Sequence, residues 1–404
     1  MKSKTLFYLI LLTFFASLIP AMQAQTFSVV YTFAGGRDGT NPVSGVTIRG
    51  NALYGTTDTY GGPGSVYQLT NNGSNWSFST LADFCSGCGP SARVVFGPDG
   101  HLYGTTVGGG AYGGGLVFKL APQVGPCRDL RCLWRVNDLH DFGSGDDGLY
   151  PGGGDLIWDR QGNIYNTTQN GGASGYGTVY QLTPSGNGYT EKVLFSFSYP
   201  TGEGPYAGLV LDKNGNLFGT TYNGGTFAGN VFELTNVPGT GWTEKILYSF
   251  QFGDDGGFPY GGVIFDSSGN LYGTTNQGGS GSGGTVFELS PSGNSWTFKL
   301  LYSFSAPLFC GPTANLTMDG AGNLYGILPC GGSNGPGVIF KLTNTENGWV
   351  YTSLHDFTGG TDGASPSGYV SIDNDGTLYG SAQAGGDMNC NGGVGCGVVW
   401  MIKP

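Results

Sequence analysis

Short apolar, β-branched runs alternate with glycine-rich polar segments along the chain, and the alternation repeats. One string, Leu-Tyr-Gly-Thr-Thr, occurs at residues 53–57, 102–106 and 271–275. Looser copies begin at Ile164, Leu217, Leu324 and Leu378. Successive copies are separated by 49 to 62 residues. A period near 50 residues in an all-strand pattern is typical of a β-propeller.

Each repeat contains four segments that predict strands. In one repeat these are Gly261–Phe265, Leu271–Thr275, Gly284–Leu289 and Trp296–Phe304. They are rich in β-branched and aromatic residues and are bounded by Gly, Pro, Asn and Asp. The first two are joined by Asp-x-x-Gly-Asn. This pattern favours a hairpin turn over a calcium loop, which needs more oxygen ligands and a final Glu.

The Gly within each Leu-Tyr-Gly-Thr-Thr string would weaken an isolated strand. We expect it to allow the neighbouring sheet to approach closely. The Tyr beside it is predicted to belong to the core between sheets and not to a ligand platform.

The two ends of the repeated region complement each other. Residues 26–33 match the fourth segment of a repeat, whereas Gly397–Ile402 matches the third and no fourth follows. We therefore expect the N-terminal strand to complete the last blade and close the ring, which removes an open sheet edge. The prediction is an all-β, seven-bladed β-propeller with four antiparallel strands per blade.

The first 24 residues predict a secretory signal peptide. Two lysines precede an apolar run, Leu6–Ile19, and small and polar residues follow, so we place cleavage after Ala24. A membrane anchor is the alternative, but the run is short for a span of about 20 residues. Residues 25–404 are predicted to form one propeller domain without a further membrane span.

Cysteine usage predicts an oxidising compartment. All eight cysteines follow the predicted signal, and an even number in that context indicates disulfides. A redox role for the Cys-x-x-Cys at residues 85–88 lacks the expected βαβ context. A zinc site would need two such pairs brought together with His or Cys in good geometry. The natural local pairs are Cys85–Cys88, Cys127–Cys132, Cys310–Cys330 and Cys390–Cys396.

Composition narrows the function classes. The 79 Gly in 404 residues disfavour helical folds, because each Gly costs about 1 kcal/mol in a helix. The formal net charge of −11 disfavours nucleic acid and anionic membrane surfaces as partners. We expect a monomer that is secreted or periplasmic.

Acidic residues recur in the loops that lead from the fourth strand of one repeat to the first of the next. They would gather on the loop-rich end of the propeller, where they suit a cation, a sugar or a basic partner. The alternative is a repeated turn in which the carboxylate caps the backbone, and the recurrence favours this alternative. Calcium is the one cofactor that the face suggests, without further support. The candidate ligand-binding residues are Asp38, Asp147, Glu203, Asp255 and Asp362.

A catalytic site is hard to place in the sequence. Its three histidines, His101, His140 and His355, fall in two kinds of repeat position, with His140 and His355 both on fourth strands. No Gly-x-Ser-x-Gly turn occurs in a strand–helix context. We therefore predict a non-catalytic scaffold that binds a glycan or an extracellular protein through its loop-rich face. The alternative is a polysaccharide hydrolase or lyase that uses acidic loop residues.

Residues 269–275, 278–279 and 284–289 read Gly-Asn-Leu-Tyr-Gly-Thr-Thr, Gly-Gly and Gly-Thr-Val-Phe-Glu-Leu. They resemble the Gloeo/Verruco tandem-repeat family, also called the choice-of-anchor tandem-repeat family, over essentially all of residues 26–404. The resemblance implies a secreted or surface-exposed bacterial protein and supplies no catalytic residues. Members often end in an anchoring tail. This sequence stops at Pro404 directly after a predicted strand, which argues against covalent surface anchoring.

Overall fold

The computed structural model describes residues 25–58, 63–90, 92–123, 134–186, 188–305, 307 and 309–404. The predicted signal peptide and the predicted Cys127–Cys132 pair lie outside these residues. The described residues form strands, turns and one 3₁₀-helix, η1 (Asn391–Gly393), without an α-helix, so the all-β prediction is confirmed. Within those ranges, no helix is long and apolar enough to span a membrane.

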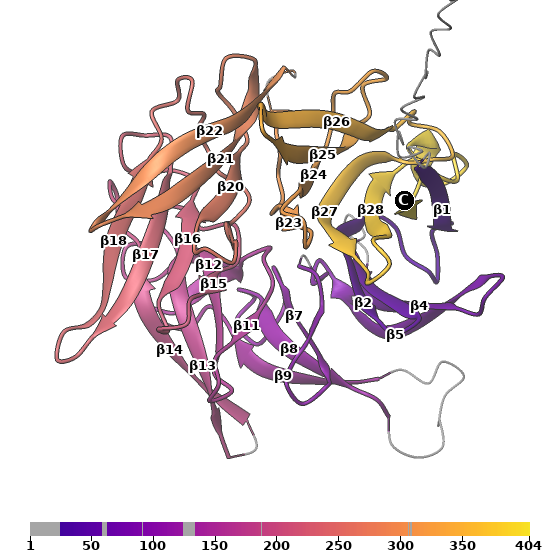
Figure 1. The fold of residues 1–404 in the computed structure, drawn as a ribbon. Coiled ribbons are helices and arrows are strands. Elements are labelled where there is room, and N and C mark those ends of the chain that lie inside the picture. The colour runs from indigo at the N-terminus through magenta and orange to yellow at the C-terminus, as the bar shows by residue number, and fades with distance from the viewer. Residues whose placement is uncertain are drawn as a thin grey trace, which may run out of the picture.

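Consecutive strands pair into sheets that lie side by side around a common centre (Figure 1). One sheet contains β6 (Val95–Phe96), β7 (Leu102–Thr106), β8 (Leu116–Ala121) and β9 (Arg135–Asp141). The next contains β10 (Gly148–Pro151), β11 (Ile157–Trp158), β12 (Ile164–Gly171), β13 (Thr178–Ser185) and β14 (Gly188–Ser196). It is followed by β15 (Val210–Leu211), β16 (Leu217–Thr221), β17 (Asn230–Val237) and β18 (Gly241–Ser249).

Two further four-stranded sheets continue this order. The first contains β19 (Ile264–Phe265), β20 (Leu271–Thr275), β21 (Ser282–Ser292) and β22 (Ser295–Ser305). The second contains β23 (Thr317–Met318), β24 (Leu324–Leu328), β25 (Val338–Thr345) and β26 (Gly348–Asp356). In each, the strands follow one another antiparallel in chain order.

The remaining strands form one sheet in the order β1-β29-β28-β27-β2-β3-β4-β5. The N-terminal β1 pairs antiparallel with the C-terminal β29, and Thr26 lies opposite Lys403. A single parallel residue pair, Gly45 with Tyr369, joins β2 to β27. The bounds are β1 (Thr26–Thr32), β2 (Pro42–Arg49), β3 (Ala52–Thr57), β4 (Pro63–Asn71), β5 (Trp76–Ser86), β27 (Ala364–Ile372), β28 (Leu378–Ala384) and β29 (Val398–Lys403).

The Gly of the repeated string makes room for an aromatic ring of its own sheet. Gly273 lies opposite Phe287 of β21, and a Cβ on Gly273 would lie 2.5 Å from Phe287 Cζ. We expected this Gly to admit the neighbouring sheet instead. The Phe287 ring occupies the space beside Gly273 because β21 pairs directly with β20. The Tyr of the string, Tyr272, is buried in the core between sheets, as predicted.

The first Thr of the string links neighbouring sheets. Thr220 donates from Oγ1 to the carbonyl oxygen of Gly261 at 3.0 Å, and Gly261 belongs to the next repeat. The same contact explains why β19 covers only Ile264–Phe265, whereas the sequence predicted a strand from Gly261. The backbone at Gly261 packs against the neighbouring repeats, since a Cβ there would lie 2.5 Å from the carbonyl oxygen of Ala314.

The Asp-x-x-Gly-Asn segments are hairpin turns closed by the Asp side chain. Asp266 Oδ1 accepts hydrogen bonds from the backbone N–H groups of Ser268 and Asn270, at 2.8 and 2.9 Å. Its Oδ2 accepts from Asn270 Nδ2 at 2.8 Å and from the Tyr272 hydroxyl at 3.3 Å. Burial opposes ionisation, but these hydrogen bonds outweigh it and hold the pKa of Asp266 below its usual range.

Three of the predicted disulfides are present in the described part of the chain. Cys85–Cys88, Cys310–Cys330 and Cys390–Cys396 each connect residues close in sequence, which confirms these local pairings.

We predict that Gly273→Ala lowers the free energy of unfolding by about 1–3 kcal/mol, because the added methyl group overlaps the Phe287 ring. Chemical denaturation measures this change. Gly320→Ala is the matched control, since a Cβ there meets nothing within 4 Å. Equal stability of both variants would contradict the packing role of Gly273.

We predict that Asp266→Ala costs about 1–2 kcal/mol near neutral pH, because four donors lose their acceptor. The folded-state pKa of Asp266 is depressed, so its contribution is present above the unfolded value of about 3.9 and fades as the pH falls below it. Urea unfolding at pH 7 and pH 3 measures the difference. Asp254→Ala, at an exposed position, should change little at either pH.

Candidate functional site

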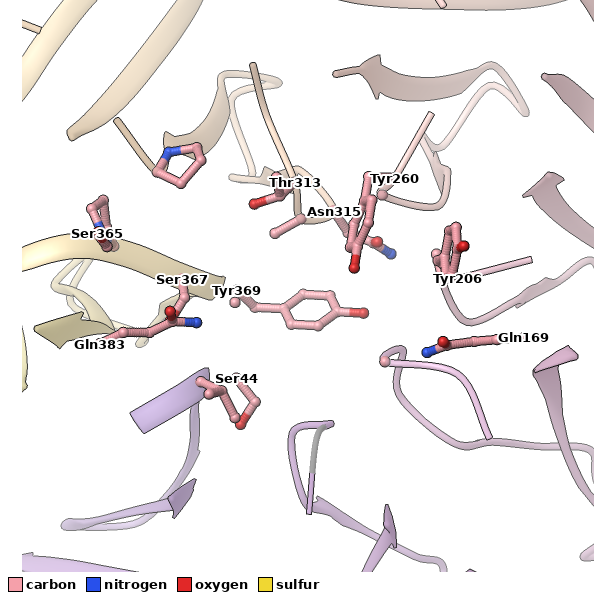
Figure 2. A pocket seen from close by; sticks show the side chains of 18 residues that line it. Ser44, Gln169, Tyr206, Tyr260, Thr313, Asn315, Ser365, Ser367, Tyr369 and Gln383 are labelled. Atoms are coloured by element: carbon pink, nitrogen blue, oxygen red, sulfur yellow. The ribbon is translucent and has the colours of Figure 1, made fainter. Parts of the chain in front are cut away.

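A pocket of about 390 Å³ lies at the centre of the molecule, where the repeats converge (Figure 2). Its lining residues come from the segments that follow the loops between strands four and one, and from the ends of strand two. Small-molecule sites typically have volumes of about 300–1,000 Å³. The pocket therefore has the size of a ligand site on the predicted loop-rich end.

The mouth of the pocket is built from two repeat positions that vary between repeats. The first position comes directly after the proline that ends the loop between the fourth strand of one repeat and the first strand of the next. In five repeats the residue at this position lines the pocket: Val43, Tyr206, Tyr260, Thr313 and Ser367. The second follows the last residue of the Leu-Tyr-Gly-Thr-Thr string, and it supplies Gln169, Pro329 and Gln383. The repeated framework thus holds a ring of unlike side chains.

Tyrosines form one wall of this ring. The rings of Tyr206 and Tyr260 stack at 5.1 Å and 12°, and Tyr222 packs edge-on against Tyr206 at 5.2 Å. Tyr260 is 43% exposed, so part of the wall is open to solvent. Burial, followed by the neighbouring phenols, raises the pKa of Tyr206, and the pKa of Tyr260 rises for the same reasons. Both side chains are therefore neutral at physiological pH.

Tyr369 reaches across the opening (Figure 2). Its side chain lines both this pocket and a second cavity of about 340 Å³. The Arg93 guanidinium lies 4.4 Å from the centre of the Tyr369 ring. Arg93 Nε donates to Asp155 Oδ1 at 3.2 Å, and Nη1 donates to Ser371 Oγ at 2.9 Å. Arg93 and Asp155 therefore neutralise each other below the pocket.

All the side chains that line the pocket are uncharged among the described residues. Polar groups come from Gln169, Gln383, Asn315 and from Ser and Thr hydroxyls, and Figure 2 shows them around the opening with Tyr369 reaching across it. Such a site offers hydrogen bonds and aromatic surface, without a carboxylate or imidazole for proton transfer.

The acidic residues predicted from the sequence lie on the same loops but outside this lining. Asp255 Oδ2 accepts hydrogen bonds from the Tyr248 hydroxyl and the Gln251 N–H, both at 2.9 Å. Asp38 makes the same pair of contacts with Tyr31 and Ala34, at 3.1 and 2.9 Å. Each of these carboxylates thus fastens its loop to the outermost strand of a sheet.

Two more of these residues use a histidine in place of the tyrosine. Asp147 Oδ2 and Asp362 Oδ2 each lie 3.0 Å from Nε2 of His140 and His355, respectively. The backbone of Glu203 instead pairs with Asn223. The structure places these five residues in separate loops of the periphery and does not bring them together.

Sequence reasoning missed the pocket residues although a signal was present. The positions after the loop proline and after the repeated string are those at which otherwise similar repeats differ.

Two half-buried glutamates, Glu191 and Glu244, lie away from the pocket. Burial is the main cause that raises the pKa of Glu191 and of Glu244 to about 7. For Glu191 the charge of Asp147 adds to the rise, and His140 opposes it. Neither glutamate lines the pocket.

Two solved structures share the fold at low sequence identity. An ulvan lyase of polysaccharide lyase family 25, also solved with a bound glucuronyl-rhamnose 3-sulfate oligosaccharide, is 11% identical, with a TM-score of 0.55, and the match covers 91% of this chain and 94% of that one. An ancestral GH74 enzyme is 11% identical, with a TM-score of 0.53, over 90% of this chain and 48% of that one. No curated protein matches the sequence.

The repeat itself identifies the family. The model of the Gloeobacter/Verrucomicrobia repeat matches residues 62–251 and 228–401, which together span most of the chain. This match confirms the resemblance seen in the repeated strings. The chain belongs to the Gloeobacter/Verrucomicrobia repeat family.

Proposed function

We propose that the protein is a seven-bladed β-propeller. The eight-stranded sheet divides at its single β2–β27 contact into one blade of β2–β5 and one of β27–β29 completed by β1. Together with the five other sheets, this accounts for the seven copies of the repeated string. The β1–β29 pairing then closes the ring.

On this scaffold, we propose that the central pocket binds a neutral saccharide without catalysis. The observation that carries the proposal is a lining of Tyr206, Tyr260 and Tyr369 with the amides of Gln169 and Gln383, free of charged side chains. Sugar rings present C–H faces that pack on aromatic rings, and their hydroxyls pair with amides and Ser or Thr hydroxyls. A neutral lining matches a ligand without charge.

The predicted location supports a glycan ligand. A protein that is exported through a signal peptide and held by disulfides works where polysaccharides are abundant. The ulvan lyase with its bound oligosaccharide supports a glycan as the class of ligand. That oligosaccharide carries carboxylate and sulfate groups, so the neutral charge proposed here rests on the uncharged pocket lining alone. We further propose that the protein acts as a monomer, since the pocket is built from one chain.

The polysaccharide hydrolase or lyase is the second candidate. The observation in its favour is the Arg93–Asp155 pair beneath Tyr369. Hydrolysis by the common route needs two carboxyl groups about 5–9.5 Å apart beside the scissile bond. Asp155 is engaged by Arg93 and does not line the pocket, which favours binding over catalysis.

The acidic loop residues are a second candidate contact for the ligand. They precede the pocket residues on the same loops, and they would bind the ligand directly or through calcium. The variants for this alternative are Asp38→Ala, Asp147→Ala, Glu203→Ala, Asp255→Ala and Asp362→Ala.

We predict that the protein, purified after expression of the full chain, binds neutral oligosaccharides on a glycan array. Titration calorimetry with the best ligand should show that Tyr206→Ala and Tyr260→Ala each weaken binding about tenfold, which corresponds to the loss of one aromatic contact. Tyr112→Ala is the matched control, because Tyr112 is 62% exposed and lies outside the pocket lining.

Other outcomes assign the function elsewhere. Binding that survives both Tyr variants but is lost with chelator or in the acidic-loop variants would place the ligand on the acidic loops. Shortened or unsaturated products would establish the enzyme. The absence of any glycan binding would refute the proposal and point to protein partners.

A further inference from the structure

At several interfaces between neighbouring sheets, the fourth strands meet through aromatic pairs. Tyr248 of β18 stacks on Phe298 of β22 at 4.4 Å and 15°, and Tyr302 stacks on Tyr351 at 5.0 Å and 12°. The first member of each pair lies two residues before the Phe that ends the fourth segment of its repeat, which is Phe250 for Tyr248 and Phe304 for Tyr302. The second member lies two residues after the first aromatic residue of the next fourth strand.

At the interface between β9 and β14, the same two positions hold His140 and Glu191. The aromatic stack is therefore replaced by an imidazole and a carboxylate. Asp147, from the loop that follows β9, adds a second carboxylate, with Oδ2 at 3.0 Å from His140 Nε2. Ligand atoms of all three side chains lie within 4.8 Å of one another.

Hydrogen bonding inside the protein leaves part of this cluster unsatisfied. Glu191 Oε1 is sealed from solvent and has no hydrogen-bond partner. The hydroxyl of Tyr180 is likewise buried without a partner, and its side chain is fully buried. Tyr180 lies near enough to Glu191 and Asp147 that both charges add to the effect of burial in raising its pKa. Buried polar groups without partners are rare. Glu244 Oε1, at the equivalent position of the next fourth strand, is also buried without a partner, so the neighbouring imidazole and second carboxylate are what distinguish Glu191.

The chain contains an internal comparison for this cluster. His355 and Asp362 form the same pair, with Nε2 and Oδ2 at 3.0 Å. The position equivalent to Glu191 is Phe27 there, and its ring stacks on His355 at 3.6 Å. The His–Asp pair therefore holds the loop against the fourth strand even where no glutamate is present. Glu191 is not needed for this role.

We propose that His140, Asp147 and Glu191 form a binding site for a divalent transition metal ion, with Zn²⁺ as the probe. One imidazole nitrogen and two carboxylate oxygens suit an ion of intermediate softness. In tetrahedral geometry, zinc–ligand bonds of about 2.0–2.2 Å place the ligand atoms about 3.3–3.6 Å apart, so side-chain rotations must bring these atoms, now within 4.8 Å of one another, around the ion. The ion would bridge two adjacent sheets. This inference is independent of the proposed saccharide site.

Calorimetric titration of the metal-free full chain with Zn²⁺ tests the site. We expect one ion per chain, and Co²⁺ should give a visible absorption band from the same site. Glu191→Gln should weaken binding at least about 100-fold, because even the loss of an outer-sphere partner costs about 10–100-fold. Circular dichroism first establishes that each variant is folded.

Two matched variants separate the site from other histidines and glutamates. Glu244→Gln changes the equivalent glutamate of the next fourth strand, and His355→Gln changes the pair that faces Phe27. Both should bind Zn²⁺ as the unaltered protein does. The proposal is overturned if the protein binds no Zn²⁺, if Glu191→Gln retains full affinity, or if His355→Gln removes the ion.

Discussion

Packing between neighbouring sheets is the interaction on which this structure depends, because a four-stranded sheet cannot cover its own apolar faces. The buried clusters show this directly. One of them joins Phe218 and Val231 of one sheet to Leu271 and Phe287 of the next. Near the centre the same packing brings backbone against backbone, as at Gly261 and Ala314. The glycine content thus reflects crowding at the axis as well as the many turns.

This packing leaves few positions free to vary. Within the repeated string, Leu and Tyr fill the core between sheets, Gly admits a ring, and Thr bonds to the next repeat, so all are constrained. The residue after the loop proline is not part of that framework, and it faces the centre. Tyr206 and Tyr260 occupy it in two repeats, whereas Thr313 and Ser367 occupy it in others. A binding site arises where the framework leaves the choice of side chain open.

The acidic residues that recur in the loops hold the backbone and do not line the pocket. Asp38 and Asp255 recur because each loop needs an acceptor for the same backbone N–H and the same strand hydroxyl. Arg93 and Asp155 occur once each and neutralise each other at the axis. The unusual combination is Glu191 beside His140 and Asp147, at positions where the β18–β22 interface has an aromatic pair. In a repeat protein, a residue that departs from the repeated pattern therefore indicates a candidate binding site better than a charged residue that recurs in most repeats.

The sequence alone determined the strands, the hairpin turns, the local disulfides and the match between the two chain ends. These features depend on residues close together in the chain, or on a pattern repeated often enough to recognise. The sequence also shows which loop positions carry neutral and which carry acidic residues. It does not show which of these residues lie together in one site. Val43, Tyr206 and Ser367 are far apart in sequence and reach one pocket only because their repeats are arranged around a common centre. The tertiary structure decided the candidate sites, since the distance between residues of different repeats depends on how whole sheets pack.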